Sequence, residues 1–114
     1  MIKIKRAYLP AEEGDGFRVL VDRLWPRGVK KENARIDLWA KDIAPSAELR
    51  QWFGHDPGKF PEFAEKYRQE LQGNGSWESF RDEVRRHDVV TLVFAARDES
   101  CNNAVVLRSL LEGE

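Results

Sequence analysis

Two segments near the start of the chain have the hydrophobic pattern of β-strands. Residues 2–8 alternate between apolar and polar side chains, as a half-exposed strand does. Residues 17–22 form a second, more apolar strand. The connection between them, residues 9–16, is rich in turn-forming residues. A parallel crossover usually takes about a dozen residues or more. This shorter connection therefore favours an antiparallel pairing for the first strand.

The middle of the chain predicts one short strand and three helices. Residues 35–43 suit a short strand, and a helix then begins at the N-cap Ser46 and ends at Gly54. In the following segment apolar residues recur at helical spacing, at Phe60, Phe63, Ala64, Tyr67 and Leu71. After a break at residues 73–76, the same spacing marks the inner face of a third helix, at Trp77, Phe80 and Val84.

The last third of the chain contains its most apolar strand. Residues 89–96 are almost continuously apolar, which is typical of a strand covered on both faces. Residues 102–113 have the pattern of a capped helix. Strands that alternate with helical segments predict an α/β layered fold with a mostly parallel central sheet flanked by helices. We expect one domain over residues 1–114, with the N-terminal strand antiparallel to the others.

Composition agrees with a folded, cytoplasmic protein. Hydrophobic residues make up 41% of the 114 residues and charged residues 34%, which is not the composition of a disordered chain. A single cysteine, Cys101, cannot form an intramolecular disulfide and fits a reducing compartment. The first residues lack the apolar stretch of a signal peptide, and residues 89–96 are too few to span a membrane. We therefore expect no membrane association.

Positive charge is concentrated in the first part of the chain. Residues 1–41 hold ten lysines and arginines against six acids, although the whole chain has a net charge of −1. This asymmetry makes nucleic-acid binding one alternative for the function. A sequence pI near 6.2 weighs against it, since dedicated nucleic-acid domains usually have a strongly basic footprint.

Charged and amide side chains follow two of the predicted strands. In parallel α/β sheets, ligands bind outside the carboxyl ends of the strands. If the strands ending at residues 22 and 96 run parallel, the loops that follow them face one crevice. Eight residues on these loops are candidates for a site: Asp22, Arg23, Trp25 and Arg27 after the first strand, and Arg97, Asp98, Asn102 and Asn103 after the second.

The residue types in this crevice point to an anion. Guanidinium groups bind carboxylate or phosphate in a bidentate manner, and the start of the last helix offers free N–H groups. Trp25 provides a flat face for a ring. Asp22 and Asp98 either hold the arginines in place or act as an acid or base. We expect Asp22 to pair with an arginine and its pKa to be depressed. The structural alternative is an Asp–Arg network that joins the loops, with Trp25 as a core residue.

Other chemically active residues give weaker indications. Cys101 has no neighbouring base to activate it, so it is interpreted as an ordinary residue near the helix cap. His55 lies in a turn rich in glycine and proline, where a capping or exposed role is favoured over acid–base catalysis. The two histidines and one cysteine lack the spacing of a metal site, and no glycine-rich phosphate loop is present. We expect neither a metal nor a cofactor.

Several strings resemble the domain-of-unknown-function 488 family, in its small single-domain YeaO-like branch. The resemblance rests on GFRVLVDRLWPRGVKKE, DLWAKDIAPSAELRQWFGHDP, FAEKYRQEL and TLVFAARDESCNNAVVLRSLL, and it covers nearly the whole chain. It implies an α/β fold and a soluble bacterial-type protein, but no assigned activity. Larger relatives carry a cysteine-histidine-arginine string after the last strand, where this chain reads ESCNNA. The motif positions are Asp22, Arg23, Trp25, Pro26, Arg27, Gly28, Lys41, Pro45, Ser46, Asn103 and Ala104.

Three functions remain open at this point. The favoured one is binding of a small anionic or phosphate-bearing metabolite in the crevice, with no catalytic activity assigned. The alternatives are nucleic-acid binding through the basic N-terminal part and a protein-interaction module without a small-molecule site. Oligomeric state is left open.

Overall fold

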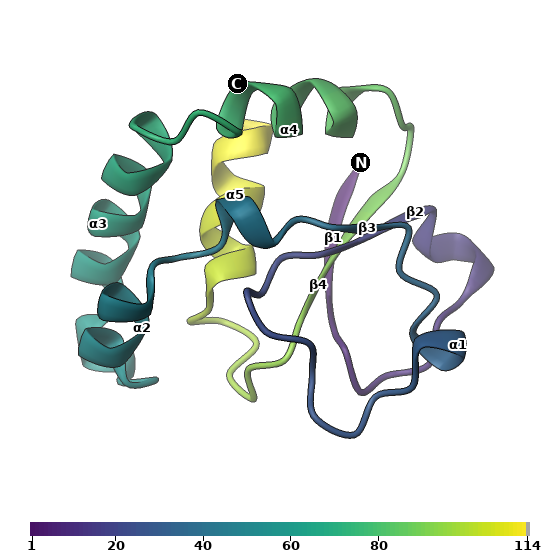
Figure 1. Ribbon diagram of the computed structural model, residues 1–114, viewed down its shortest axis with the longest axis horizontal. Coiled ribbons are helices and arrows are strands. Elements are labelled where there is room, and N and C mark those ends of the chain that lie inside the picture. The colour runs from purple at the N-terminus through teal and green to yellow at the C-terminus, as the bar shows by residue number, and fades with distance from the viewer. Residues whose placement is uncertain (114) are drawn as a thin grey trace.

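The computed structural model describes residues 1–113, which form a central four-stranded sheet with helices around it (Figure 1). All strand pairs are parallel and the strand order is β1-β4-β2-β3. This arrangement confirms the predicted α/β fold with a parallel sheet. It also confirms that the most apolar strand lies in the interior of the sheet, where all of its residues are buried. The strands are β1 Ile2–Arg6, β2 Phe17–Leu20, β3 Leu38–Trp39 and β4 Val90–Phe94.

The prediction of an antiparallel N-terminal strand is wrong. β1 pairs in parallel with β4, with Ile2 opposite Val90, and β4 separates β1 from β2. Since β1 and β2 are not neighbours, the loop between them is neither a hairpin nor a helical crossover between adjacent strands. This loop leads from the end of β1 back to the start of β2 and contains a 3₁₀ turn at Glu13–Asp15. The ten residues 7–16 are enough for a crossover between these two parallel strands, although parallel connections usually take about a dozen or more.

Within residues 1–113, five α-helices surround the sheet, and α2 to α4 follow the predicted pattern. The Ser46 hydroxyl caps α2 by accepting a hydrogen bond of 3.1 Å from the Leu49 N–H, and Gly54 ends the helix in the left-handed region. The predicted strand at residues 35–43 is confirmed only at its centre. After β3 the chain turns at Ala40 into a 3₁₀ turn, which buries Ile43. The helices are α1 Lys31–Ala34, α2 Ala47–Phe53, α3 Phe60–Gln72, α4 Trp77–Arg85 and α5 Asn103–Glu112.

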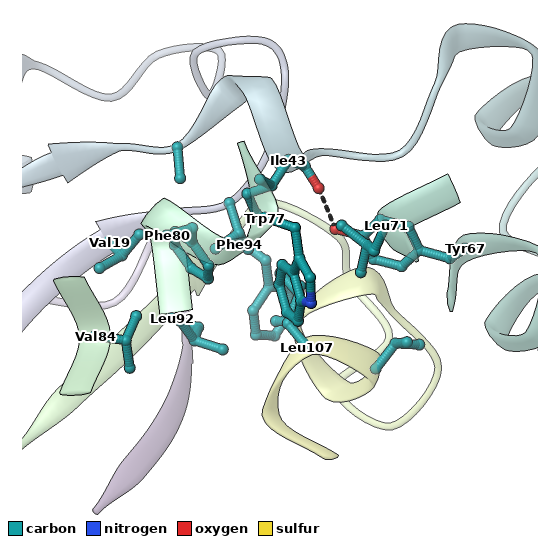
Figure 2. Close-up of a cluster of buried hydrophobic side chains, with 14 of the residues drawn as sticks. Val19, Ile43, Tyr67, Leu71, Trp77, Phe80, Val84, Leu92, Phe94 and Leu107 are labelled. Atoms are coloured by element: carbon teal, nitrogen blue, oxygen red, sulfur yellow. Dashed lines mark hydrogen bonds between the residues drawn. The ribbon is translucent and has the colours of Figure 1, made fainter. Parts of the chain in front are cut away.

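The main hydrophobic core lies between one face of the sheet and helices α2 to α5 (Figure 2). The apolar residues of α3 share this core with β4, as predicted from their spacing, and Phe60 packs at its edge. At its centre the hydroxyl of Tyr67 donates a 2.6 Å hydrogen bond to the carbonyl oxygen of Ile43. This bond ties α3 to the 3₁₀ turn that leads into α2. None of the helices in residues 1–113 is long and apolar enough to cross a membrane.

A smaller core covers the opposite face of the sheet, on the side of α1 (Figure 1). Leu20 and Val93 are buried there beneath Trp25 and Trp39, whose rings meet edge to face at 5.5 Å. The indole N–H of Trp25 donates to the carbonyl of Val29 at 2.7 Å. Trp25 therefore fixes the loop after β2, which carries two of the candidate arginines.

Candidate functional site

A cavity of about 920 Å³ lies at the carboxyl ends of β2 and β4. Its walls come from the loop after β2, from α2 and the turn that follows it, and from the loop between β4 and α5. Because β2 and β4 are adjacent and parallel, their following loops meet at one edge of the sheet. All eight residues selected from the sequence line this cavity: Asp22, Arg23, Trp25, Arg27, Arg97, Asp98, Asn102 and Asn103.

Asp22 lies where the two strands end and is half-buried. Its Oδ2 accepts a 2.8 Å hydrogen bond from the backbone N–H of Ala95, and its Oδ1 accepts one of 3.1 Å from the side-chain amide of Asn103. The carbonyl of Asp22 is held in turn by the indole N–H of Trp39 at 2.8 Å. One carboxylate therefore connects β2, β4 and α5 at the cavity wall.

The predicted pairing of Asp22 with an arginine is wrong. Asp22 forms no ion pair with any residue of the described part of the chain. Burial raises its pKa, and this effect outweighs the hydrogen bonds and the positive charges of Arg50 and His55, which lower it. The prediction of a depressed pKa is wrong for the same reason: desolvation dominates where no guanidinium is in contact.

Two of the other polar candidates have their groups engaged within the loop before α5. Asp98 Oδ1 accepts hydrogen bonds from the N–H groups of Ser100 and Cys101, at 2.8 and 2.9 Å. Asn102 is the N-cap of α5, because its side-chain oxygen accepts from Val105 N–H at 3.0 Å. Asp98 and Asn102 thus shape the loop, and the carboxylate of Asp98 already occupies two amides to which an external anion would otherwise bind.

Asn103 joins the last helix to the end of β2. Its side-chain N–H₂ group donates to the carbonyl of Val21 at 3.0 Å as well as to Asp22. This contact spans more than 80 residues of sequence and holds the start of α5 against the neighbouring strand. The position of the cavity therefore depends on the first turn of α5.

Arginine is the dominant charged residue of the cavity. The half-buried Arg23 donates from Nη2 to the carbonyl of Ala44 at 3.2 Å, which holds its side chain against the turn before α2. The other three arginines of the cavity, Arg27, Arg50 and Arg97, are exposed to solvent. Within residues 1–113 none of the four forms an ion pair with a carboxylate. These four cavity arginines are Arg23, Arg27, Arg50 and Arg97.

Two further residues line the cavity: Arg50, which was not among the sequence candidates, and His55, for which the sequence favoured a capping or exposed role. Arg50 lies on α2, and His55 follows that helix with a left-handed backbone, at φ 58°. A signal for Arg50 is present in the sequence: Ala47, Arg50 and Gln51 lie three and four residues apart, and all three line the cavity. That spacing identifies the exposed face of α2, but only the folded chain shows that this face turns toward Asp22.

Cys101 lines the cavity without the properties of an activated nucleophile. Burial and the nearby charge of Asp98 raise the pKa of its thiol, which opposes the lowering expected at a helix N-terminus. Over residues 1–113, His, Cys, Asp and Glu side chains nowhere gather in groups of three or more that could hold a metal ion.

Fold and site together define an α/β protein with an arginine-lined cavity at the carboxyl edge of a parallel sheet. The chain belongs to the DUF488 family: residues 1–114 match the family model described as the inactive DUF488-N3 subclade. An uncharacterized protein of Mycobacterium tuberculosis (strain H37Rv) is 43% identical over 112 residues, which cover 98% of this chain and 94% of that protein. The uncharacterized protein YeaO of Escherichia coli K12 is 40% identical over 110 residues, 96% of each chain. No solved structure matches the chain.

Proposed function

We propose that this protein binds a small anionic or phosphate-bearing molecule in the cavity at the carboxyl ends of β2 and β4. The observation that carries the proposal is the group of four cavity arginines, which come from three separate segments and lack carboxylate partners in the described part of the chain. Guanidinium groups recognise carboxylate and phosphate oxygens through paired hydrogen bonds. The positive end of the α5 dipole adds to the same field.

The cavity also has apolar walls, which favour an anion with an organic body. Leu24, Trp25, Pro45 and Phe53 line it. Its volume of about 920 Å³ is sufficient for a small metabolite. Binding without turnover agrees with the description of the family model as inactive and with a Cys101 thiol whose pKa is raised. We therefore assign binding, and no reaction.

Three basic groups of the N-terminal part are engaged in internal contacts, which weighs against nucleic-acid binding through them. Lys5 forms ion pairs with Glu12 and Asp15, and the buried Arg18 also pairs with Asp15. Arg6 donates to the carbonyl of Ala96. These basic groups stabilise the N-terminal loop and are not available to a phosphate backbone. We also infer a cytoplasmic location and a single domain, on the basis of the lone cysteine and the chain length.

A thermal-shift titration with ethyl phosphate tests the proposal. A ligand that binds only the folded state raises the melting temperature. We expect ethyl phosphate to raise it for the wild type, and Arg50→Ala and Arg97→Ala to weaken this response. Arg85→Ala is the matched control, because Arg85 is an exposed arginine outside the cavity. Equal responses from all four proteins, or none from the wild type at any concentration, would refute the proposal.

A further inference from the structure

In the described part of the chain, the cavity contains two carboxylates that its arginines do not neutralise, those of Asp22 and Asp98. Asp22 lines the wall and receives one hydrogen bond on each oxygen, from Ala95 and from Asn103. A carboxylate offers about four lone-pair sites, so each Asp22 oxygen keeps the capacity to accept a further hydrogen bond. Asp98, the other acid of the cavity, uses Oδ1 to accept two backbone N–H groups of its own loop.

An unneutralised carboxylate is unfavourable in a site for a simple anion. Arg50 and His55 are close enough to influence Asp22 electrostatically, yet neither forms an ion pair with it in the described part of the chain. The negative charge of Asp22 opposes the binding of any second anion near it. A group that donates a hydrogen bond to Asp22 would satisfy the carboxylate, and a donating ammonium group would also offset its negative charge.

From this arrangement we propose that the cavity selects an anion that also carries a hydrogen-bond-donating group, an amine or a hydroxyl, positioned to meet Asp22. The inference rests on the proposed function, since the arginines are taken to hold the anionic end. It narrows the ligand class from any small anion to amino- or hydroxy-substituted anions. In such a ligand, a short organic link joins the anion to the donor.

Three probes of similar size separate the contributions. Ethyl phosphate carries the anion alone, 2-hydroxyethyl phosphate adds a hydroxyl, and O-phosphoethanolamine adds an ammonium group. Calorimetric titration should give a Kd for O-phosphoethanolamine about tenfold below that for ethyl phosphate, because hydrogen bonds to charged groups are among the stronger ones. The four cavity arginines alone would give the opposite order, since they repel an ammonium group. An equal or weaker affinity for O-phosphoethanolamine would overturn the inference.

Two variants locate the preference at Asp22. Asp22→Asn should abolish the tenfold advantage of O-phosphoethanolamine. Asp98→Asn, which removes the same charge from the same cavity while keeping an acceptor for the loop amides, should retain it. The comparison of probes on the wild type remains decisive if Asp22→Asn fails to fold. Loss of the preference in Asp98→Asn as well would refute a specific role for Asp22.

The failure of this inference is distinguishable from the failure of the proposed function. If all three phosphates bind with equal affinity, the cavity binds anions but does not recognise a hydrogen-bond-donating group on the ligand. If none binds, the proposed function fails with it. If ethyl phosphate binds only when Asp22 is protonated, the carboxyl group of Asp22 donates a hydrogen bond to the anion. The proposal that the ligand carries a donor for Asp22 is then wrong.

Discussion

Replacing Tyr67 by phenylalanine removes one hydroxyl group from the centre of the core and leaves the ring in place. Tyr67 has no exposed surface, and its hydroxyl donates a 2.6 Å hydrogen bond to the carbonyl of Ile43, which is also buried. The variant loses this bond and leaves a carbonyl without its partner in a site closed to water. We expect the free energy of unfolding to fall by about 2 kcal/mol. For a chain of this length that corresponds to a melting temperature lower by roughly 8 °C.

The assay is urea unfolding followed by tryptophan fluorescence. Tyr8→Phe is the matched control, because the hydroxyl of Tyr8 also donates to a backbone carbonyl, that of Arg27, but on an exposed side chain. We expect this control to change the free energy of unfolding by less than about 0.5 kcal/mol. Equal changes in the two variants, or no measurable change in Tyr67→Phe, would refute the importance of the Tyr67–Ile43 bond.

Three further changes test other parts of the structure. Gly16→Ala should destabilise the fold by about 3 kcal/mol. Gly16 has a φ of 64°, and an added Cβ would overlap the backbone of Val89. Chemical denaturation measures this loss of stability. Asn102→Ala should cost about 1 kcal/mol through loss of the α5 cap on Val105, measured in the same way. Burial raises the pKa of Asp22 in the folded protein. The contribution of Asp22 to stability is therefore fully present below the ordinary carboxyl pKa, and it is lost as the pH rises through the pKa that Asp22 has in the folded protein. Unfolding measured against pH should therefore show a decline that is absent in Asp22→Asn, and an Asp22 pKa at or below its ordinary value by NMR would contradict this.

Hydrophobic spacing was sufficient to predict most of the fold. The stripe that contains Phe63, Tyr67 and Leu71 identifies α3, and the run at residues 89–96 identifies the buried strand β4. Strand order could not be predicted in the same way, because the insertion of β4 between β1 and β2 depends on contacts far apart in sequence. The antiparallel prediction failed for this reason.

The position of the cavity could be predicted from the sequence, whereas the electrostatics of Asp22 could not. The position of charged residues after two apolar strands identified the cavity that the structure contains. The protonation behaviour of Asp22 depends on how much solvent reaches it and on which groups it contacts. Neither property is visible in the order of residues. Arg50 was missed because an exposed arginine on a helix is common, and only the packing of α2 turns it toward the cavity.

An NMR titration of the ¹⁵N-labelled protein with ethyl phosphate tests directly whether the cavity binds an anion, because backbone amide shifts report where a ligand binds. We expect saturable shifts concentrated at residues 22–27, 50–55 and 95–103, around the four cavity arginines. Residues 3–18, whose basic groups are engaged in internal contacts, should shift little. Shifts centred on residues 3–18, or an absence of saturable shifts in residues 22–27 and 95–103, would contradict the account.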